Sequence, residues 1–356
     1  MDFELTEEQA ALREVSRAML AANCPPALAR SLAEAGRDTD DKLWQQAAEL
    51  GWIDLAVPAE YDGSGQGLAE LCLVAEEIGR AAAPGAFTDS ALTALVLAES
   101  GRPDLLPGLA GGGLKASWAH HGLVSSRRDG ADLVLSGRAT AVQAAASADW
   151  LLVTADSGEG KRLAIVETAR AQVEARRTLD ETRRWYDVVF DDVHVPAADV
   201  LTADATRIQW LADAAAVLTA ADALGLGERL LEMTVSYVKV REQFGRPLGS
   251  FQSVKHKAAG MLTTLKGARA AAYYAAMALD ARAADAAAAA STAKAFTGEG
   301  VAALAGEALQ THGGIGFTWE HELHRYLRRA KTDEMLYGSA AEHYERLVAL
   351  TEAAPR

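Results

Sequence analysis

Two segments near the C-terminus combine residue types that suit contact with a ligand. Tyr237–Met261 contains Arg241 and Phe244 in the spacing RxxFG, and Ala308–Lys331 contains the spacing QxxGGxG. The guanidinium group of an arginine is planar and carries several hydrogen-bond donors, and glycines let another group approach the backbone closely. Taken singly, the first pattern is also typical of a surface arginine before a helix kink, and the second of a helix-ending turn. Each segment alone therefore leaves both interpretations open.

Acidic side chains offer several candidates for proton transfer. Each lies on a predicted helix among charged neighbours, which favours a solvated helix face over a catalytic role. Glu342 is the strongest of them as an alternative base. The candidates are Asp213, Asp222, Asp333, Glu334 and Glu342.

Imidazole and basic groups form three further clusters. Glu320, His321 and His324 have a spacing that can bind metal, but no third ligand segment accompanies them, so no metal site is expected. His120–His121 is predicted to be a polar pair in a loop, and the basic run Arg325–Lys331 is predicted to pair with acidic helix faces. No Ser-His-Asp or Cys-His spacing supports a hydrolase.

The elements that must position these residues change in character along the chain. Helical patterns fill the first third, where Thr6 and Gln9 predict a capping box. Short segments rich in β-branched and aromatic residues follow, and long helical patterns return after Asp204, including the alanine-rich run 269–296. This order predicts an α+β multidomain chain. We place an N-terminal helical domain at 1–112, a middle β domain at 113–203 and a helical bundle at 204–356.

Composition limits the class of protein. The chain has 356 residues and a formal net charge of −14. The resulting negative electrostatic field repels nucleic acids and anionic lipids, which argues against a nucleic-acid binder or a polybasic membrane anchor. Its two cysteines, Cys24 and Cys72, form no CxxC pair, which fits a reducing compartment. Neither a signal peptide nor an uninterrupted apolar run long enough to span a membrane is recognised, so a cytoplasmic protein is expected.

The two C-terminal segments together resemble the acyl-CoA dehydrogenase family. LGWIDLAVPAEYDGSGQG near the N-terminus and VVFDDVHVPAADVL at the end of the middle region are also similar to that family. The resemblance implies a helical domain, a β-barrel-like middle domain and a C-terminal four-helix bundle. It also implies an FAD that lies across a subunit interface, with these segments reaching the cofactor of the neighbouring subunit.

The resemblance assigns roles to residues of the half of the flavin site that serves the neighbour. Arg241 would bind the diphosphate, since bidentate donors suit phosphate oxygens. Gln243, Phe244 and Gln252 would line the adenosine half. The ADP portion would be contacted by Gln310, Gly313 and Gly314.

The same resemblance exposes losses around the chain's own flavin. Family members carry a catalytic carboxylate directly after a tyrosine, or on the helix that precedes RxxFG. Here Gly338 follows Tyr337, and Ala215 and Ala216 occupy the second place, so neither position can remove a proton. The segments that would contact the flavin ring are also altered. The loop corresponding to TEPxxGSD reads SWAHHGLVSSRRDG, Ala141 and Gln143 replace a Trp and a Thr, and Ala340 replaces a hydroxyl residue.

This selective loss resembles the base-lacking subunit of heteromeric (α2β2) actinobacterial steroid side-chain acyl-CoA dehydrogenases. It implies a heterotetramer in which a second acyl-CoA dehydrogenase-like subunit supplies the base, FAD is shared, and a bulky acyl-CoA fits into room left by the lost pocket. An electron-accepting flavoprotein would complete the reaction. Two alternatives stay open: a homotetrameric enzyme with Glu342 as a displaced base, and a flavin-free structural pseudoenzyme.

Overall fold

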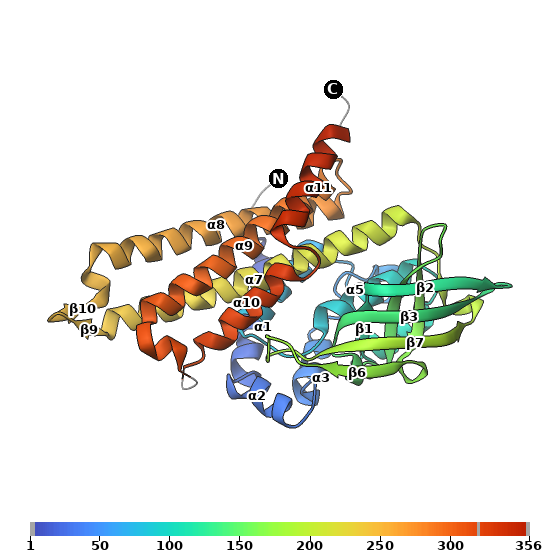
Figure 1. The fold of residues 1–356 in the computed structure, drawn as a ribbon, viewed down its shortest axis with the longest axis horizontal. Coiled ribbons are helices and arrows are strands. Elements are labelled where there is room, and N and C mark those ends of the chain that lie inside the picture. The colour runs from blue at the N-terminus through green and yellow to red at the C-terminus, as the bar shows by residue number, and fades with distance from the viewer. Residues whose placement is uncertain (1–3, 319–320, 354–356) are drawn as a thin grey trace.

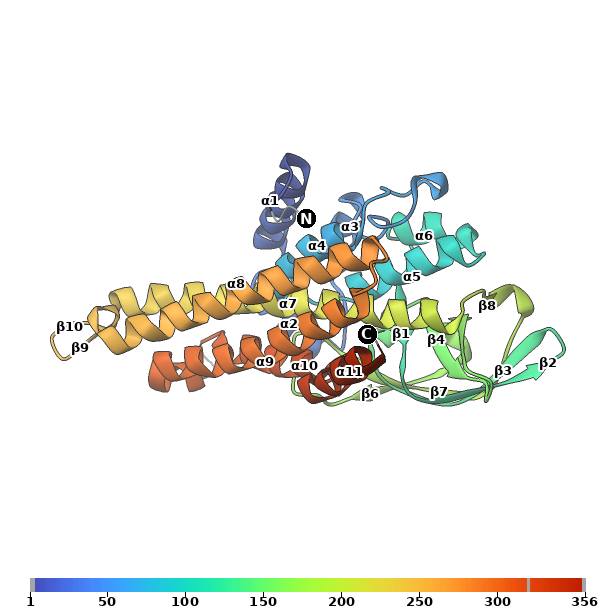
Figure 2. The ribbon, with the colours of Figure 1, turned by 90° about the horizontal axis from the view of Figure 1, so that it is seen from above.

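The computed structural model describes residues 4–318 and 321–353. Figure 1 shows an elongated body, with a bundle of long helices at one end and a twisted sheet at the other. Helices from the N-terminal part of the chain cover the junction between the two, and the final helix projects away from the body. Figure 2 shows from above that the bundle and the sheet lie end to end.

The N-terminal part of the chain is helical. The predicted capping box is confirmed, because the Thr6 side chain accepts from the Gln9 N–H while the Gln9 side chain accepts from the Thr6 N–H. The fourth of these helices is almost wholly buried, since its apolar residues face the bundle on one side and the first helix on the other. The helices are α1 (Glu7–Asn23), α2 (Ala27–Glu34), α3 (Asp41–Glu49), α4 (Leu68–Arg80), α5 (Phe87–Glu99) and α6 (Leu106–Ala110).

One eight-stranded mixed sheet forms the middle of the chain. Its hydrogen-bonded order is β6-β7-β3-β2-β4-β5-β8, with β1 parallel to β4. The strands predicted from β-branched runs are present, whereas β2 occupies the segment expected to be an altered loop. The strands are β1 (Ala116–Ala119), β2 (His121–Asp129), β3 (Asp132–Gln143), β4 (Trp150–Asp156), β5 (Lys161–Glu167), β6 (Gln172–Arg176), β7 (Trp185–Val195) and β8 (Val200–Leu201).

Long helices make the C-terminal bundle. The longest is also apolar enough to span a membrane by composition, but 89% of its most apolar window is buried inside the fold, as expected of a core helix. A small hairpin at the far tip of the bundle joins the first two long helices. The elements are α7 (Ala205–Val240), β9 (Glu242–Gln243), β10 (Arg246–Pro247), α8 (Gln252–Asp280), α9 (Ala286–His312), α10 (Leu323–Met335) and α11 (Ala340–Ala353).

The alanine-rich run is two helices rather than the single helix that its composition predicts. It breaks between α8 and α9, where Arg282 adopts a φ of +48°. Beside the break, the Asp280 carboxylate accepts hydrogen bonds from the Leu68 and Ala69 N–H groups and so caps α4. Helix propensity could not reveal this turn, because a contact from a segment some 210 residues away takes part in it.

Helices α4 and α7 touch backbone to backbone, which joins the N-terminal helices to the bundle. A Cβ at Gly79 would lie 1.9 Å from the Asp222 carbonyl oxygen, and a Cβ at Gly225 would lie 1.8 Å from the Glu76 carbonyl oxygen. Only glycine permits an approach this close. No space for a ligand is left between the two helices at these crossings.

Candidate functional site

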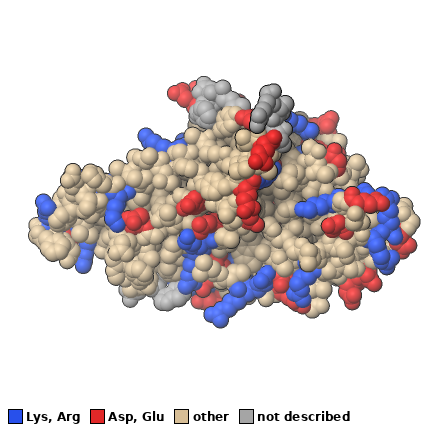
Figure 3. Space-filling model, turned by 45° about the horizontal axis from the view of Figure 1, so that its top comes forward, with Lys and Arg blue, Asp and Glu red and all other residues tan. Residues whose placement is uncertain are grey.

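Residues expected to contact a neighbour's cofactor gather at the far tip of the bundle. Arg241 ends α7, where its N–H donates to the Tyr237 carbonyl, and the β9–β10 hairpin follows it. The ring of Phe244 is 90% exposed on a backbone with a φ of +54°. On the face shown in Figure 3, the charged atoms at the left tip are Lys and Arg.

The second expected segment lies at the same end. Helix α9 finishes at His312, and Gly313, with a φ of +64°, opens the turn GGIGF. A Cβ at Gly313 or Gly314 would meet no atom within 4 Å, so the backbone of this turn is open to another molecule. Gln252 begins α8 and Gln310 lies in the last turn of α9, both exposed. We call these seven residues the clamp: Arg241, Gln243, Phe244, Gln252, Gln310, Gly313 and Gly314.

The clamp is remote from the chain's own flavin-ring positions. Gln209, in the second turn of α7, borders the cleft beside Gly338, whereas Arg241 ends the same helix. At a rise of about 1.5 Å per residue they are about 48 Å apart. One dinucleotide cannot reach from the clamp to the cleft beside Gly338.

Gly338, the first expected place of the base, lies in a turn that other groups fix. Tyr337 has a φ of +54°, and Gly338 a φ of +108°. The buried Lys294 ammonium donates to the carbonyls of Glu334 (3.0 Å) and Gly338 (2.8 Å). A Cβ at Gly338 would lie 2.8 Å from Nε2 of His343, which also contacts the Tyr337 carbonyl at 3.0 Å. His343 therefore takes the space that a side chain at Gly338 would need.

Ala215 and Ala216, the second expected place, lie in the buried middle of α7. They are 3% and 1% exposed, and the Ala215 carbonyl accepts from the Thr219 hydroxyl. Neither side chain can transfer a proton. The structure places no carboxylate at either position.

A small cavity separates Tyr337 from the other flavin-ring positions. Gln143 and Tyr337 both line it, together with Asp89 of α5 and Leu218 of α7, and its volume is about 30 Å³. The Gln143 amide donates to the Gly85 carbonyl at 2.7 Å, and Ala141 lies at a β-bulge with a φ of +54°. A cavity this small holds about one water molecule. This cavity by itself therefore has no room for a bulky acyl group, and polar side chains line much of it.

Buried charges close the rest of this cavity. Arg329 of α10 makes a bidentate pair with Asp222 of α7 at 2.9 Å. Arg183, from the β6–β7 loop, binds Asp180 at 2.7 Å and Asp333 of α10 at 2.5 Å. The set contains three carboxylates and two guanidinium groups, all buried. Charges of this kind are stable only when paired, so the set ties the bundle to the middle part of the chain.

An aromatic cluster covers the remaining side of Tyr337. The Trp118 ring stacks on the Tyr337 ring with 5.8 Å between the ring centroids. The centroid of the His120 ring lies 4.3 Å from that of Trp118 and 6.1 Å from that of Tyr337. The His121 and Tyr337 rings are also neighbours, with their centroids 5.3 Å apart. Burial, with the nearby His121 as a smaller cause, lowers the pKa of His120 to about 3. The histidines are thus not the polar loop pair that the sequence predicts, because β1 and β2 meet directly at His120 without a loop.

A wider cleft of about 380 Å³ lies on the outer side of the Tyr337–Gly338 turn, and Glu342, the alternative base, borders it. The Glu342 carboxylate accepts from the Ser339 N–H at 2.7 Å and from its hydroxyl at 2.8 Å. These bonds, the backbone one foremost, lower the pKa of Glu342. A carboxylate engaged in a helix cap with a lowered pKa is a poor general base.

Three of the carboxylates expected on solvated faces are buried. Asp213 is 4% exposed and pairs bidentately with Arg346 of α11, while Asp222 and Asp333 belong to the charged set described above. Their partners lie on other elements, so helical periodicity alone gave the wrong environment. Glu334 pairs with Lys331 at 2.9 Å.

The basic run pairs largely as predicted. Arg328 binds Glu181 at 2.8 Å, and Arg329 and Lys331 have the carboxylate partners already given. Of the suspected metal set, Glu320 lies outside the described residues, and His321 accepts from the Leu323 N–H. Within residues 4–318 and 321–353, no three His, Cys, Asp or Glu side chains gather as metal ligands would.

Sequence reasoning missed the groups that close this site. Lys294 stands in an alanine-rich helix and His343 in a charged one, so neither carries a motif. Arg183 follows no recognisable pattern either. A single lysine at a core-facing position was the one available signal, because buried lysines need specific partners.

Known proteins share both the sequence and the fold. Residues 6–113 match the acyl-CoA dehydrogenase N-terminal domain and residues 205–349 the C-terminal domain. The chain is 33% identical to acyl-CoA dehydrogenase IpdE2 of Mycolicibacterium smegmatis over 97% of its length and 99% of that protein. It is also 33% identical to IpdE2 of Mycobacterium tuberculosis over 96% of both chains.

Two solved heteromeric assemblies contain similar chains. One chain of the ChsE4–ChsE5 complex from Mycobacterium tuberculosis superposes with a TM-score of 0.93 at 28% identity, over the full length of both. A chain of a variant of the Tcur3481–Tcur3483 steroid ACAD superposes with a TM-score of 0.91 at 29% identity, over 97% of this chain and 98% of that one. Near-complete coverage in sequence and fold shows that this chain belongs to the acyl-CoA dehydrogenase family.

Proposed function

We propose that this chain is the non-catalytic subunit of a heteromeric FAD-dependent acyl-CoA dehydrogenase. It contributes the clamp to a flavin site whose ring and base belong to a partner subunit. One contrast carries the proposal: the clamp is open at the tip of the bundle, while the chain's own flavin-ring positions enclose about 30 Å³.

The residues present fit one half of the cofactor and not the other. Arg241 has no ion pair among the described residues, so its guanidinium is available to a diphosphate. The open Gly313–Gly314 turn and the exposed Phe244 ring suit the adenosine side. By contrast, the packed rings of Trp118, His120 and Tyr337 leave no slot for an isoalloxazine.

The reaction of the assembly is α,β-dehydrogenation of an acyl-CoA thioester. When bound, FAD supplies the hydride acceptor, and a carboxylate of the partner subunit takes the α proton. This chain's part is to bind and orient the ADP side of the cofactor through the clamp, since Gly338 and Ala215 cannot act as bases. An electron-accepting flavoprotein would take up the electrons from the assembly.

The proposed substrate is a bulky acyl-CoA of the steroid side-chain type. The similarity to a chain of a steroid ACAD, over 97% of the present sequence, supports this choice. Because this chain's own cavity is closed, the acyl group lies in the partner subunit's pocket. We propose the cytoplasm as the location.

A homotetramer that uses Glu342 is the alternative reading. Glu342 borders a cleft of about 380 Å³ next to Gly338, but its carboxylate caps α11. A flavin-free pseudoenzyme is the third reading, and the open clamp gives it no support.

The visible absorption spectrum separates the three readings. The chain is purified alone and after co-expression with a candidate partner subunit. We expect a colourless chain alone, and flavin bands near one FAD per pair of chains in the complex. Stoichiometric flavin in the lone chain would establish the homomeric enzyme instead, and absence of flavin from a stable complex would establish the pseudoenzyme.

A further inference from the structure

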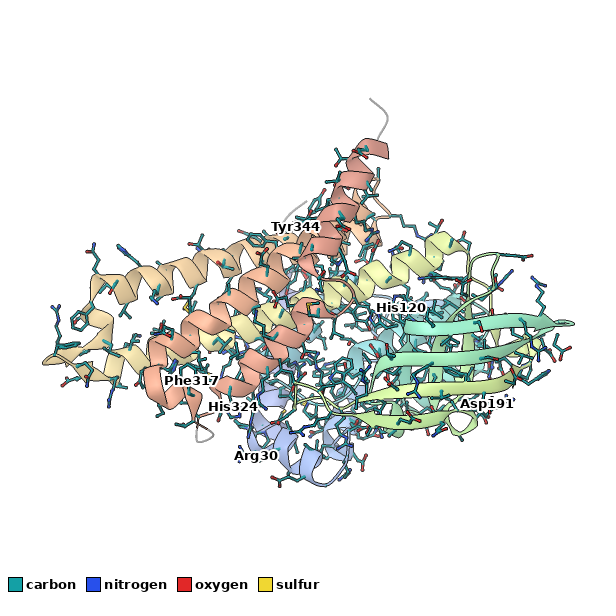
Figure 4. All side chains as sticks on the ribbon, in the orientation of Figure 1. Arg30, His120, Asp191, Phe317, His324 and Tyr344 are labelled. Carbon is teal, nitrogen blue, oxygen red and sulfur yellow. The ribbon has the colours of Figure 1, made fainter. Side chains whose placement is uncertain are left out.

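A third cavity lies where three parts of the chain meet, away from both the clamp and the Tyr337–Gly338 turn. Its volume is about 510 Å³, within the range of small-molecule pockets. Helix α2 forms one wall, the β6–β7 loop another and α10 the third. The lining residues are Ala29, Arg30, Ala33, Glu34, Glu181, Thr182, His324 and Arg325. Figure 4 shows Arg30 on α2 and His324 on α10 on the same side of the molecule.

Two arginines of different elements line this cavity. Arg30 comes from α2 and Arg325 from the first turn of α10. Across residues 4–318 and 321–353, neither guanidinium has a hydrogen bond or ion pair to a side chain. This is unusual in the present chain, where most of the neighbouring basic groups, such as Arg328 and Arg329, have carboxylate partners.

Acidic residues of the cavity do not neutralise the pair. Glu181 is already bound to Arg328 at 2.8 Å. Glu34 lies one helical turn after Arg30, yet no ion pair forms between them. Among the residues that line the cavity and that the structure describes, the two arginines thus place two positive charges against one carboxylate without an ion pair, that of Glu34.

The electrostatic environment agrees with this geometry. Arg325 is half-buried, and its pKa is lowered first by desolvation and then by the nearby positive charge of Arg30, while the negative charges of Glu322 and Glu181 oppose the shift. Two guanidinium groups that line one cavity repel each other, and an anion bound between them would reduce that repulsion. A phosphate group is the best match, because each guanidinium can donate two parallel hydrogen bonds to its oxygens.

We propose that the cavity between α2, the β6–β7 loop and α10 is a binding site for a small phosphate-bearing ligand, held by Arg30 and Arg325. The Thr182 hydroxyl, on the cavity wall, already accepts from Arg329 at 3.2 Å, so the loop is fixed before a ligand arrives. A bound phosphate ties α2 to α10. The site is independent of the proposed flavin-sharing role, and its ligand stabilises the junction of the three parts.

Isothermal titration calorimetry with the full-length chain, in whichever assembly it purifies, tests the site. Inorganic phosphate and glycerol 3-phosphate are the probes, at constant ionic strength set with sodium chloride. We expect one site per chain, with affinity reduced about tenfold or more in Arg30→Gln and in Arg325→Gln, since each removes charge-assisted bonds. Tighter binding of glycerol 3-phosphate would identify an organic phosphate as the ligand, and equal binding would identify the phosphate group itself.

Arg37→Gln is the matched control, because Arg37 lies just past α2, is exposed and pairs with Asp41 outside the cavity. It should leave the affinity unchanged, and circular dichroism should show all three variants folded. Absence of heat with both probes would overturn the proposal. So would binding that Arg30→Gln and Arg325→Gln leave intact, since the phosphate would then lie elsewhere.

Discussion

Replacing Arg241 by alanine should strip flavin from the mixed complex without disturbing the fold. The side chain is exposed at the end of α7 and has no ion pair within the described part of the chain. Only its backbone groups take part in the fold: the N–H donates to Tyr237 and the carbonyl accepts from Leu248. A surface substitution of this kind changes the free energy of unfolding by no more than about 0.5 kcal/mol.

The loss in cofactor affinity follows from the bonds that the guanidinium would make. Hydrogen bonds to charged groups contribute about 1.5–3 kcal/mol, and about 1.4 kcal/mol corresponds to a factor of ten in affinity. We therefore expect FAD to bind about 10- to 150-fold more weakly to the Arg241→Ala complex. Arg241→Lys should recover only part of this, because an ammonium cannot donate bidentately.

The assay is FAD titration of the deflavinated complex, followed by flavin absorbance, with thermal unfolding measured in parallel. Arg128→Ala is the matched control, an exposed arginine on β2 at the opposite end of the molecule. It should leave both the affinity and the melting temperature unchanged. Equal FAD affinity in the Arg241→Ala and Arg128→Ala complexes would refute the assignment of the clamp.

Three further outcomes are expected. Gly338→Glu should create no dehydrogenase activity in the lone chain and should lower its melting temperature, because the new Cβ would meet His343 at 2.8 Å on a backbone with positive φ; turnover by this variant would contradict the closed cavity. Lys294→Met should destabilise the fold by about 1–3 kcal/mol in denaturant unfolding, since two buried carbonyls lose their donor; an unchanged midpoint would show that water replaces the ammonium. Burial raises the pKa of Asp333 to about 7 and that of Asp89 to about 6, so the folded chain holds protons that the unfolded chain releases near pH 4. These two carboxyls therefore lower stability as pH rises from about 4 to 7, while His120, whose pKa is lowered to about 3, raises it up to about pH 6.5. The test is therefore the difference between variants: the free energy of unfolding of Asp333→Asn relative to the unsubstituted chain should change between about pH 4 and 7, and parallel profiles would show that another group titrates.

Local patterns in the sequence predicted much of the fold. The Thr6 capping box, the runs that became β3, β4, β5 and β7, and the long helices after Asp204 each depend on neighbouring residues along the chain. The clamp motifs are local too. A glycine turn and an arginine at a helix end can each be recognised from a few consecutive residues, so the family of the chain could be identified from them.

Contacts between distant segments decide which groups surround the chain's own flavin-ring positions. The sequence showed that Gly338 and Ala215 lack carboxylates, but not that paired charges line the small cavity beside Tyr337. Asp222 and Arg329 are 107 residues apart, and Arg183 and Asp333 are 150 apart. Pairing over such distances leaves no periodic signal, which is why these carboxylates were expected on solvated faces.

The sequence alone therefore determined the family, the order of helical and β segments, and the absence of a base at the two expected positions. Only the tertiary structure decided that the clamp and the flavin-ring positions lie about 48 Å apart along α7, that His343 and Lys294 fix the Gly338 turn, and that paired charges fill the cavity. The physical reason is that burial and charge pairing are properties of residues brought together by folding, whereas motifs and propensities act between neighbours in the chain.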